Sequence, residues 1–190
     1  MLDHARAARA GAPAGNPQSI HREGRAARAA LDGARDAAAA ALGVDAPDLV
    51  FCGSGTEAVN LALLGAARRL PPGRSFVTWE VEHPAVLGAA RRLQLEGVPV
   101  VVLGVDAGCR PDVAAIPDDA GLVSTSVANS EVGTLQPVAE IAARAAGLGA
   151  LLHVDCCQGA RWLRPPVDRC DLASFSGHKL GAGAGGLLYA

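Results

Sequence analysis

The sequence alternates short apolar runs with longer segments in which small and aliphatic residues recur at helical spacing. The strand-length runs are 49–52, 75–79, 98–103, 122–127, 150–154, 172–175 and 186–189. Helical patterns cover 20–42, 56–70, 84–96 and 137–148, and Gly43 ends the first of them. Strands that alternate with helices form a parallel sheet with helices packed on its faces. The sequence therefore predicts an α/β fold with a mainly parallel central sheet flanked by helices.

The remaining segments define the expected domain organisation. Residues 1–15 hold Ala, Arg, Gly and Pro without periodicity, which predicts an irregular N-terminal segment. Residues 104–120 are rich in Gly, Pro and Asp and are expected to form at most a short helical turn. A chain of 190 residues suits one domain or part of a larger one, so we expect residues 16–190 to form one domain or part of one.

Composition argues against two classes of partner. The 17 Lys and Arg residues are offset by 19 Asp and Glu, and aromatic residues make up 3% of the chain, so no basic, aromatic surface for nucleic acid is expected. The longest apolar runs, such as 98–103, are far shorter than the roughly 20 residues of a membrane span. No secretory signal is visible, and five cysteines without zinc-ribbon spacing suggest no disulfide framework. We expect a cytoplasmic protein.

Polar and glycine-rich motifs directly follow five of the predicted strands. They are 53–57 after the first strand, 82–83 after the second, 129–133 after the fourth, 155–158 after the fifth and 176–179 after the sixth. Ligands in open α/β sheets gather at the carboxyl ends of the strands. These motifs are therefore the candidates for a functional site.

Two of these motifs can be interpreted in two ways each. The turn Gly53-Ser54-Gly55 opens a helix at Thr56, where free N–H groups favour a phosphate, although glycines also occur in such turns for backbone reasons alone. It matches neither a P-loop nor a dinucleotide-binding fingerprint. His83, at a helix start, could lie against a flat ligand or face solvent.

Asp155 also has two interpretations. It could serve as a capping or surface residue, or as the counter-charge to a cationic heteroaromatic nitrogen, which a pyridine cofactor requires. His153 precedes it on the same face of the strand, but the spacing of His153, Asp155, Cys156 and Cys157 matches no common metal site. No metal is expected.

Lys179 is the only lysine among the 17 basic residues. Arg serves at every other basic position, but Arg cannot lose its proton to become a nucleophile, whereas a partly desolvated lysine can form a Schiff base with an aldehyde. Ser176 and His178 offer hydrogen-bond donors beside it, and the glycines at 181, 183, 185 and 186 would let the backbone pass close to a ligand. A lysine retained by chance is the alternative.

Together these motifs resemble the class V aminotransferase superfamily, and within it the cysteine desulfurases of the NifS and IscS type. The matching stretches occur in the family's order and at close to its spacing: GNPQSIHREGRAAR (15–28), GSGTEAVNLAL (53–63), EHPAVL (82–87), NSEVGTLQPV (129–138), HVDCCQ (153–158) and SFSGHK (174–179). The resemblance implies a fold-type-I enzyme that uses pyridoxal 5'-phosphate and normally forms a homodimer with sites at the subunit interface.

The resemblance also implies roles for individual residues. Lys179 would form the Schiff base and move the proton at the substrate's Cα, Asp155 would pair with the pyridinium nitrogen, and His83 would stack on the ring. Gln158 would bond the phenolic oxygen of the cofactor. The expected catalytic residues are Lys179, His83 and Asp155, and the expected cofactor contacts are Gly55, Thr56, His83, Ser130, Asp155, Gln158, Ser176, Gly177, His178 and Lys179.

The implied reaction converts L-cysteine to L-alanine and passes the sulfur to an enzyme cysteine, and from there to a sulfur-acceptor protein, as in iron–sulfur cluster assembly. Another class V enzyme, such as an aminotransferase or a selenocysteine lyase, would share Lys179 and Asp155, although the 15–28 and 129–138 stretches favour the desulfurase. A noncatalytic remnant that binds cofactor or a partner is the alternative outside enzymes.

The chain departs from the family pattern in several places. Ser130 stands where the family has a second Asn that contacts the cofactor, the N-terminal signature is reduced, and the Gly-Pro expected after the lysine is missing from 181–184. The family continues past the lysine into a small domain that carries the persulfide-forming Cys and a substrate-binding Arg, so this sequence is expected to be truncated after the lysine. None of the five cysteines matches that nucleophile, Cys156 and Cys157 included.

Overall fold

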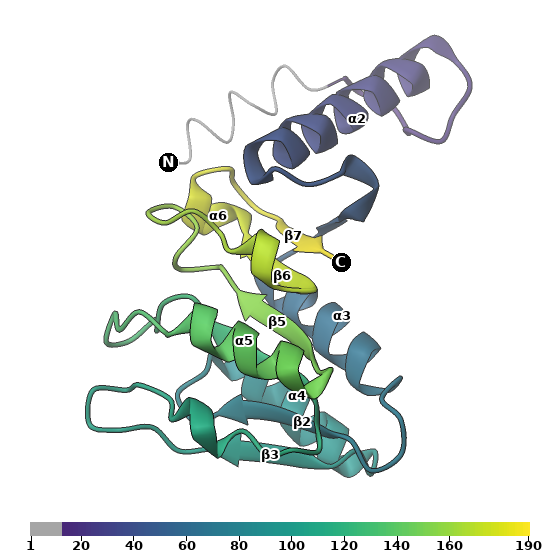
Figure 1. Ribbon diagram of the computed structural model, residues 1–190. Coiled ribbons are helices and arrows are strands. Elements are labelled where there is room, and N and C mark those ends of the chain that lie inside the picture. Colours follow the sequence, from purple (N-terminus) through teal and green to yellow (C-terminus); the bar gives the residue numbers. More distant parts are fainter. Residues whose placement is uncertain (1–12) are drawn as a thin grey trace.

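A seven-stranded sheet forms the centre of the computed structural model, which describes residues 13–190 (Figure 1). Most of the predicted irregular segment, residues 1–12, lies outside the described residues, and residues 13–15 contain no helix or strand. The strands are β1 (Leu49–Cys52), β2 (Ser75–Trp79), β3 (Val100–Leu103), β4 (Ala120–Ser126), β5 (Leu151–Asp155), β6 (Leu172–Ser176) and β7 (Gly186–Tyr189). The α-helices are α2 (Arg22–Leu42), α3 (Gly55–Ala67), α4 (Pro84–Leu95), α5 (Val138–Leu148) and α6 (Gly177–Leu180).

The sheet is mainly parallel, which confirms the predicted fold class. The strand order is β1-β7-β6-β5-β4-β2-β3, and β7 alone runs antiparallel to its two neighbours. The connection from β6 to β7, residues 177–185, is shorter than the dozen or more residues that a parallel crossover needs. The chain therefore turns back, and β7 fills the space between β1 and β6.

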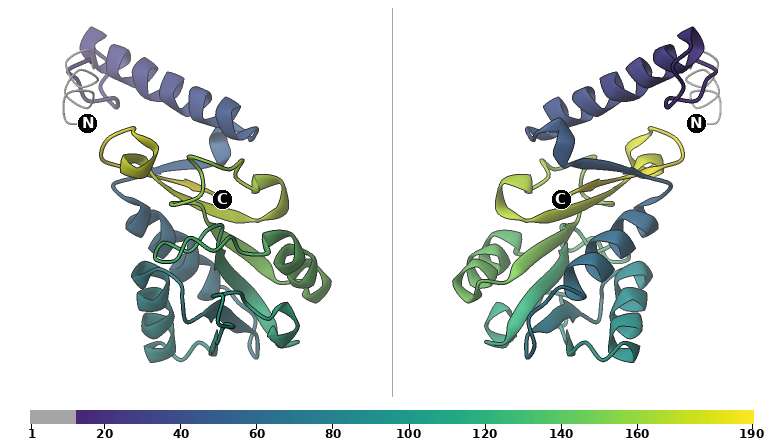
Figure 2. Two further views of the ribbon diagram at one scale, coloured as in Figure 1. Left: turned by 90° about the vertical axis from the view of Figure 1, so that its left-hand side faces the viewer. Right: turned by 90° about the vertical axis from the view of Figure 1, so that its right-hand side faces the viewer.

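Helices cover both faces of the sheet (Figure 2). On one face, Leu63 of α3 and Leu93 of α4 pack against Phe76 and Leu122. On the opposite face, α5 packs against the neighbouring strand residues, which include Val77, Val123 and Leu152. Because successive residues of a strand point to opposite faces, Phe76 and Val77 belong to different cores.

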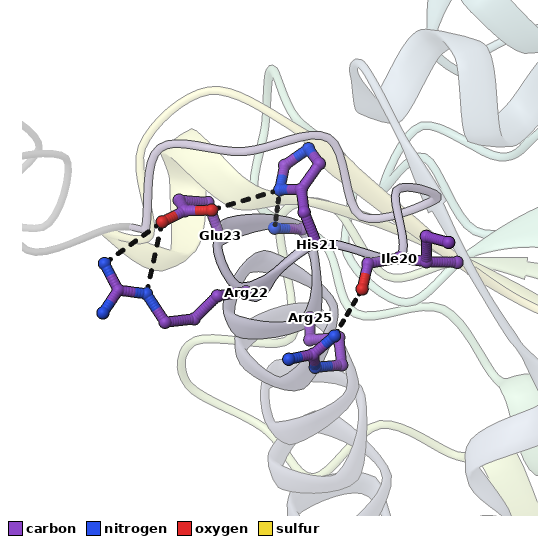
Figure 3. A network of polar contacts seen from close by, with 6 residues as sticks. Ile20, His21, Arg22, Glu23 and Arg25 are labelled. Atoms are coloured by element: carbon purple, nitrogen blue, oxygen red, sulfur yellow. Dashed lines mark hydrogen bonds and ion pairs between the residues drawn. The ribbon is translucent and has the colours of Figure 1, made fainter.

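Helix α2 lies beyond the β1 end of the sheet and projects away from it (Figure 1). Its C-terminal half is joined to β1, since the Arg35 guanidinium lies 5.0 Å from the ring centroid of Phe51 and donates to the Leu49 carbonyl oxygen. Its N-terminus holds the polar network of Figure 3, in which His21 Nδ1 accepts from the Gly24 amide at 3.2 Å. The 15–28 stretch therefore begins a helix.

The remaining regular structure consists of single turns. Three 3₁₀ turns cover Ala46–Asp48, Val113–Ala115 and Val167–Arg169. The second of them is the short turn that was predicted within 104–120. Across residues 13–190, no helix combines the length and the hydrophobicity that a membrane span requires.

The packing of α4 predicts a sharp contrast between two of its leucines. Leu93 is fully buried and Leu95 is 84% exposed. We expect Leu93→Ala to lower the free energy of unfolding by about 2–5 kcal/mol, because it removes buried methyl groups and leaves a cavity. Leu95→Ala is the matched control and should change it by less than about 0.5 kcal/mol. Urea denaturation measures both, and equal losses in the two variants would contradict this packing.

Candidate functional site

A pocket opens at the carboxyl end of the central strands. Nine of the ten residues expected to contact a cofactor line it, and the tenth, Gly177, lies between two lining residues. The structure thus brings the predicted motifs together, while the chemical role of each residue stays a prediction. The lining residues are Ser54, Gly55, Thr56, Val59, Val81, His83, Ala85, Ser126, Ala128, Asn129, Ser130, Asp155, Cys157, Gln158, Ser176, His178 and Lys179.

Asp155 is placed by the register of the sheet. It ends β5, opposite Ser126 of β4 and Ser174 of β6. Its side chain is 6% exposed, and Oδ1 accepts a hydrogen bond from the Cys157 amide at 2.9 Å. This bond fixes the carboxylate at the base of the pocket.

The N-terminus of α3 forms one wall of the pocket. Ser54 caps the helix by accepting from the Glu57 amide at 3.0 Å, and the Glu57 carboxylate accepts from the Gly53 amide at 2.6 Å. This reciprocal arrangement resembles a capping box. Within residues 13–190, the amides of Gly55 and Thr56 have no hydrogen-bond partner, so they are free to bind an anion.

Two glycines allow the N-terminus of α3 to lie in close contact with the ends of the neighbouring strands. A Cβ at Gly55 would lie 2.8 Å from Cys157 Sγ and 2.9 Å from Ser176 Cβ. A Cβ at Gly186, in β7, would lie 2.2 Å from the Ser54 carbonyl oxygen. Gly186 was expected to let the backbone pass close to a ligand, and in the structure it makes room for the backbone at the start of α3.

Lys179 lies on α6, one turn after β6. The Ser176 hydroxyl and His178 Nδ1 are 2.9 Å apart beside it. Lys179 is half-buried and forms no hydrogen bond or ion pair within the described part of the chain. Its amine is thus available to a ligand. The four-residue helix was not predicted, because a segment this short shows no periodicity.

His83 and Ser130 complete the rim of the pocket. His83 is exposed, and its Nδ1 accepts from the Ala85 amide at 3.1 Å, so the residue caps α4 while it lines the pocket. The two interpretations of His83 are therefore compatible. The Ser130 hydroxyl lies 3.4 Å from a Glu131 oxygen, and the preceding Asn129 holds the loop by donating to the Val81 carbonyl oxygen at 2.8 Å.

A buried polar row lies beneath the pocket and was not foreseen from the sequence. His153 is fully buried, with Nδ1 2.9 Å from the Ser124 hydroxyl and Nε2 3.1 Å from the Ser174 hydroxyl. Burial lowers the pKa of His153 to about 4, against the raising effect of Asp155, so the imidazole is neutral. Polar residues at every second position, such as Ser124 and Ser126, were the available sequence evidence.

Glu82 is a second residue that the sequence did not distinguish. It is 5% exposed, and its Oε1 accepts from the Ser126 amide at 3.0 Å. Burial and, to a smaller extent, Asp155 raise the pKa of Glu82 to about 8.

Within residues 13–190, no group of three or more His, Cys, Asp or Glu side chains could hold a metal ion.

Comparison with known proteins identifies the family. The family model for class-V aminotransferases matches residues 10–190. The chain belongs to the class-V aminotransferase family. Members of this family, cysteine desulfurases among them, depend on pyridoxal phosphate.

Individual relatives agree with this assignment. The chain is 37% identical to a cysteine desulfurase of a Nostoc species, over 92% of this chain and 46% of that protein. It is 39% identical to the cysteine desulfurase IscS of Klebsiella pneumoniae, again over 92% of this chain and 46% of that protein. The chain thus spans about half the length of the curated relatives it matches.

Solved structures share the fold. A NifS-like protein superposes with a TM-score of 0.89 at 30% identity, over 98% of this chain and 54% of that one. SspA, solved in complex with cysteine, has the same TM-score at 29% identity, over 100% of this chain and 57% of that one. The fold of residues 13–190 is thus that of the corresponding part of these proteins.

The contact at Gly55 predicts opposite effects of one substitution at two positions of α3. Gly55→Ala would push a methyl group against Cys157 and Ser176, so we expect a loss of about 1–3 kcal/mol in the free energy of unfolding. A Cβ at Gly65 would meet nothing within 4 Å, and Gly65→Ala should stabilise the protein by about 0.5–1 kcal/mol through helix propensity. Urea denaturation compares them, and a stabilising Gly55→Ala would contradict the close contact.

The neutral His153 predicts a sensitivity to acid. Its pKa is about 4 in the folded protein and 6.5 without the protein environment, so the unfolded chain binds the proton first. The contribution of neutral, buried His153 to the free energy of unfolding is therefore fully present above pH 6.5, and it is lost as the pH falls toward about 4. We expect His153→Gln to lose less unfolding free energy than the parent between about pH 7 and about pH 5 in urea titrations.

Leu95→Ala, an exposed substitution that leaves every titratable group in place, provides the control for this measurement and should keep the pH dependence of the parent. An identical pH dependence in the parent and in His153→Gln would show that His153 takes up its proton without cost, contrary to its burial.

Proposed function

We propose that this chain binds pyridoxal 5'-phosphate in the pocket as the cofactor-binding part of a cysteine desulfurase. The reaction converts L-cysteine to L-alanine and passes the sulfur to a cysteine thiol as a persulfide. One observation carries the proposal: a buried carboxylate, a half-buried primary amine and a helix N-terminus with free amides all line the same pocket. The identity to cysteine desulfurases supports the choice of substrate.

The lining residues fit the cofactor chemically. The free amides of Gly55 and Thr56, with the Ser176 hydroxyl and His178, would hold the phosphate. Asp155 is the only acidic residue that lines the pocket within the described part of the chain, and it would face the ring nitrogen. Ser130 and Gln158 would contact the polar edge of the ring. When bound, the cofactor accepts electron density from the Cα of an amino acid.

The chain's own residues supply the remaining chemistry. The Asp155 carboxylate, held by the Cys157 amide, would stabilise positive charge on the ring nitrogen. The Lys179 amine, without a partner in residues 13–190, would hold the cofactor and move the proton at the substrate's Cα. His83 would lie against the ring, since its Nδ1 is already engaged by the Ala85 amide and its position is therefore fixed.

We propose that the cysteine that forms the persulfide is not one of the residues that line this pocket. Cys157 is the only cysteine that lines the pocket in the described part of the chain. Burial, and then the charge of Asp155, raise the pKa of the Cys157 thiol far above its ordinary value. A thiol that keeps its proton is a poor nucleophile, so Cys157 does not suit the role of the persulfide-forming group.

We also propose a cytoplasmic homodimer that passes sulfur to an acceptor protein. Five free cysteines, Cys52, Cys109, Cys156, Cys157 and Cys170, suit a reducing compartment. A second hollow beside the pocket shares Ser130 and Gln158 with it and is bordered by Trp162, which is 77% exposed. An apolar rim next to the pocket supports an interface between subunits at this place.

Reductive trapping tests the proposal on a chain with a single lysine. Borohydride treatment with pyridoxal phosphate should fix the cofactor on the peptide that contains Lys179, and mass spectrometry identifies the peptide. Lys179→Arg keeps the charge, cannot react, and should abolish the attachment. The α-amino group is the only other primary amine in the chain, so label confined to the N-terminal peptide, or no label, would overturn the proposed cofactor site.

A further inference from the structure

Glu82 is a buried carboxyl group beside the pocket that the proposed chemistry does not use. It follows β2, and its backbone amide donates to the Trp79 carbonyl oxygen at 3.1 Å. The residues on either side, Val81 and His83, line the pocket, whereas Glu82 points into the protein and is 5% exposed. A carboxylate at such a position loses its hydration and needs hydrogen bonds or an opposite charge in return.

The two oxygens of Glu82 have different surroundings. Oε1 accepts from the Ser126 amide at 3.0 Å and lies 3.4 Å from the Ser126 hydroxyl. Oε2 is buried and has no hydrogen-bond partner in residues 13–190. An ionised Glu82 would therefore leave negative charge on an oxygen that nothing compensates, whereas a proton on Oε2 removes that charge and keeps both contacts of Oε1.

The groups packed around Glu82 oppose its ionisation. Asp155, at the end of β5, is the charged group that faces it, and Ser126, which bonds to Glu82, is in register with Asp155. The adjoining strand β4 presents Thr125 and Ser126, which do not titrate near neutral pH, and His83 follows in the same segment. Each of the two acids accepts one backbone amide, but Asp155 lines the pocket whereas the second oxygen of Glu82 is buried without a partner, so the negative charge belongs on Asp155.

We propose that Glu82 is a positioning residue that holds a proton at neutral pH, fixes the end of β4 through Ser126 and leaves Asp155 as the single negative charge at the base of the pocket. The consequence for the cofactor ring rests on the proposed function, whereas the protonation of Glu82 and its bonds to Ser126 are independent of that function. A neutral acid in this place can be replaced by an amide of the same shape, because Gln keeps the acceptor oxygen that corresponds to Oε1 and carries no charge.

The test is the pH dependence of unfolding without cofactor. A raised pKa in an acid means that the unfolded chain releases the proton first, so the contribution to stability is complete below pH 4.5 and is lost as the pH rises toward about 8. Between about pH 6 and about pH 7.5, the unfolding equilibrium constant of the parent should rise roughly tenfold per pH unit relative to that of Glu82→Gln. Glu80→Gln, in the same turn but exposed, is the matched control and should follow the parent.

Cofactor retention then tests the positioning role. Glu82→Gln should keep the dissociation constant for pyridoxal phosphate at pH 7 within about threefold of the parent, whereas Glu82→Ala, which loses the bonds to Ser126, should weaken it at least about tenfold, a change of about 1.4 kcal/mol. If Glu82→Ala does not fold, the comparison of Glu82→Gln with the parent decides. An unchanged pH dependence in Glu82→Gln, or tenfold weaker binding in that variant, would overturn the proposal. Failure of trapping at Lys179 in the parent would instead overturn the cofactor site and leave the unfolding result standing.

Discussion

The parallel pairing of β4, β5 and β6 is the constraint on which the rest of the site depends. Adjacent strands lie about 4.8 Å apart, so strands that end at the same level bring their last side chains into contact. In this protein Asp155 at the end of β5 is level with Ser126 at the end of β4 and with Ser174 of β6, and β6 ends two residues later at Ser176. A shift of one residue in either register would turn Asp155 toward the opposite face, where α5 packs on an apolar core.

Helix α3 depends on the same strand ends. Its first turn lies against Ser176 and Cys157 on one side and against Gly186 of β7 on the other. The antiparallel β7 is therefore part of the site, although it lines no part of the pocket, because it supports the helix whose free amides face the pocket. The short connection that carries Lys179 joins these two functions: it turns the chain back and presents the amine.

Most of the polar groups beneath the pocket are neutral. His153 bridges two serine hydroxyls across three strands, and its environment keeps the imidazole uncharged. Such a row satisfies buried polar atoms without placing a second charge near Asp155. The charge of the site is thereby concentrated on Asp155 and Lys179, which line the same pocket. This separation of neutral support from charged lining suits the proposed cofactor, which is an ionic ligand with a flat ring.

The sequence by itself determined the order of the strands and of the longer helices, the family and the motifs that line the pocket, because each of these depends on local periodicity and on residue types next to strand ends. Only the tertiary structure decided the orientation of β7, the role of Gly186, the capping by His83 and the burial of Glu82 and His153. These features arise from contacts between segments far apart in the chain. The local sequence around Glu82 or His153 does not reveal whether water or protein surrounds the side chain. That difference in surroundings decides which groups carry charge.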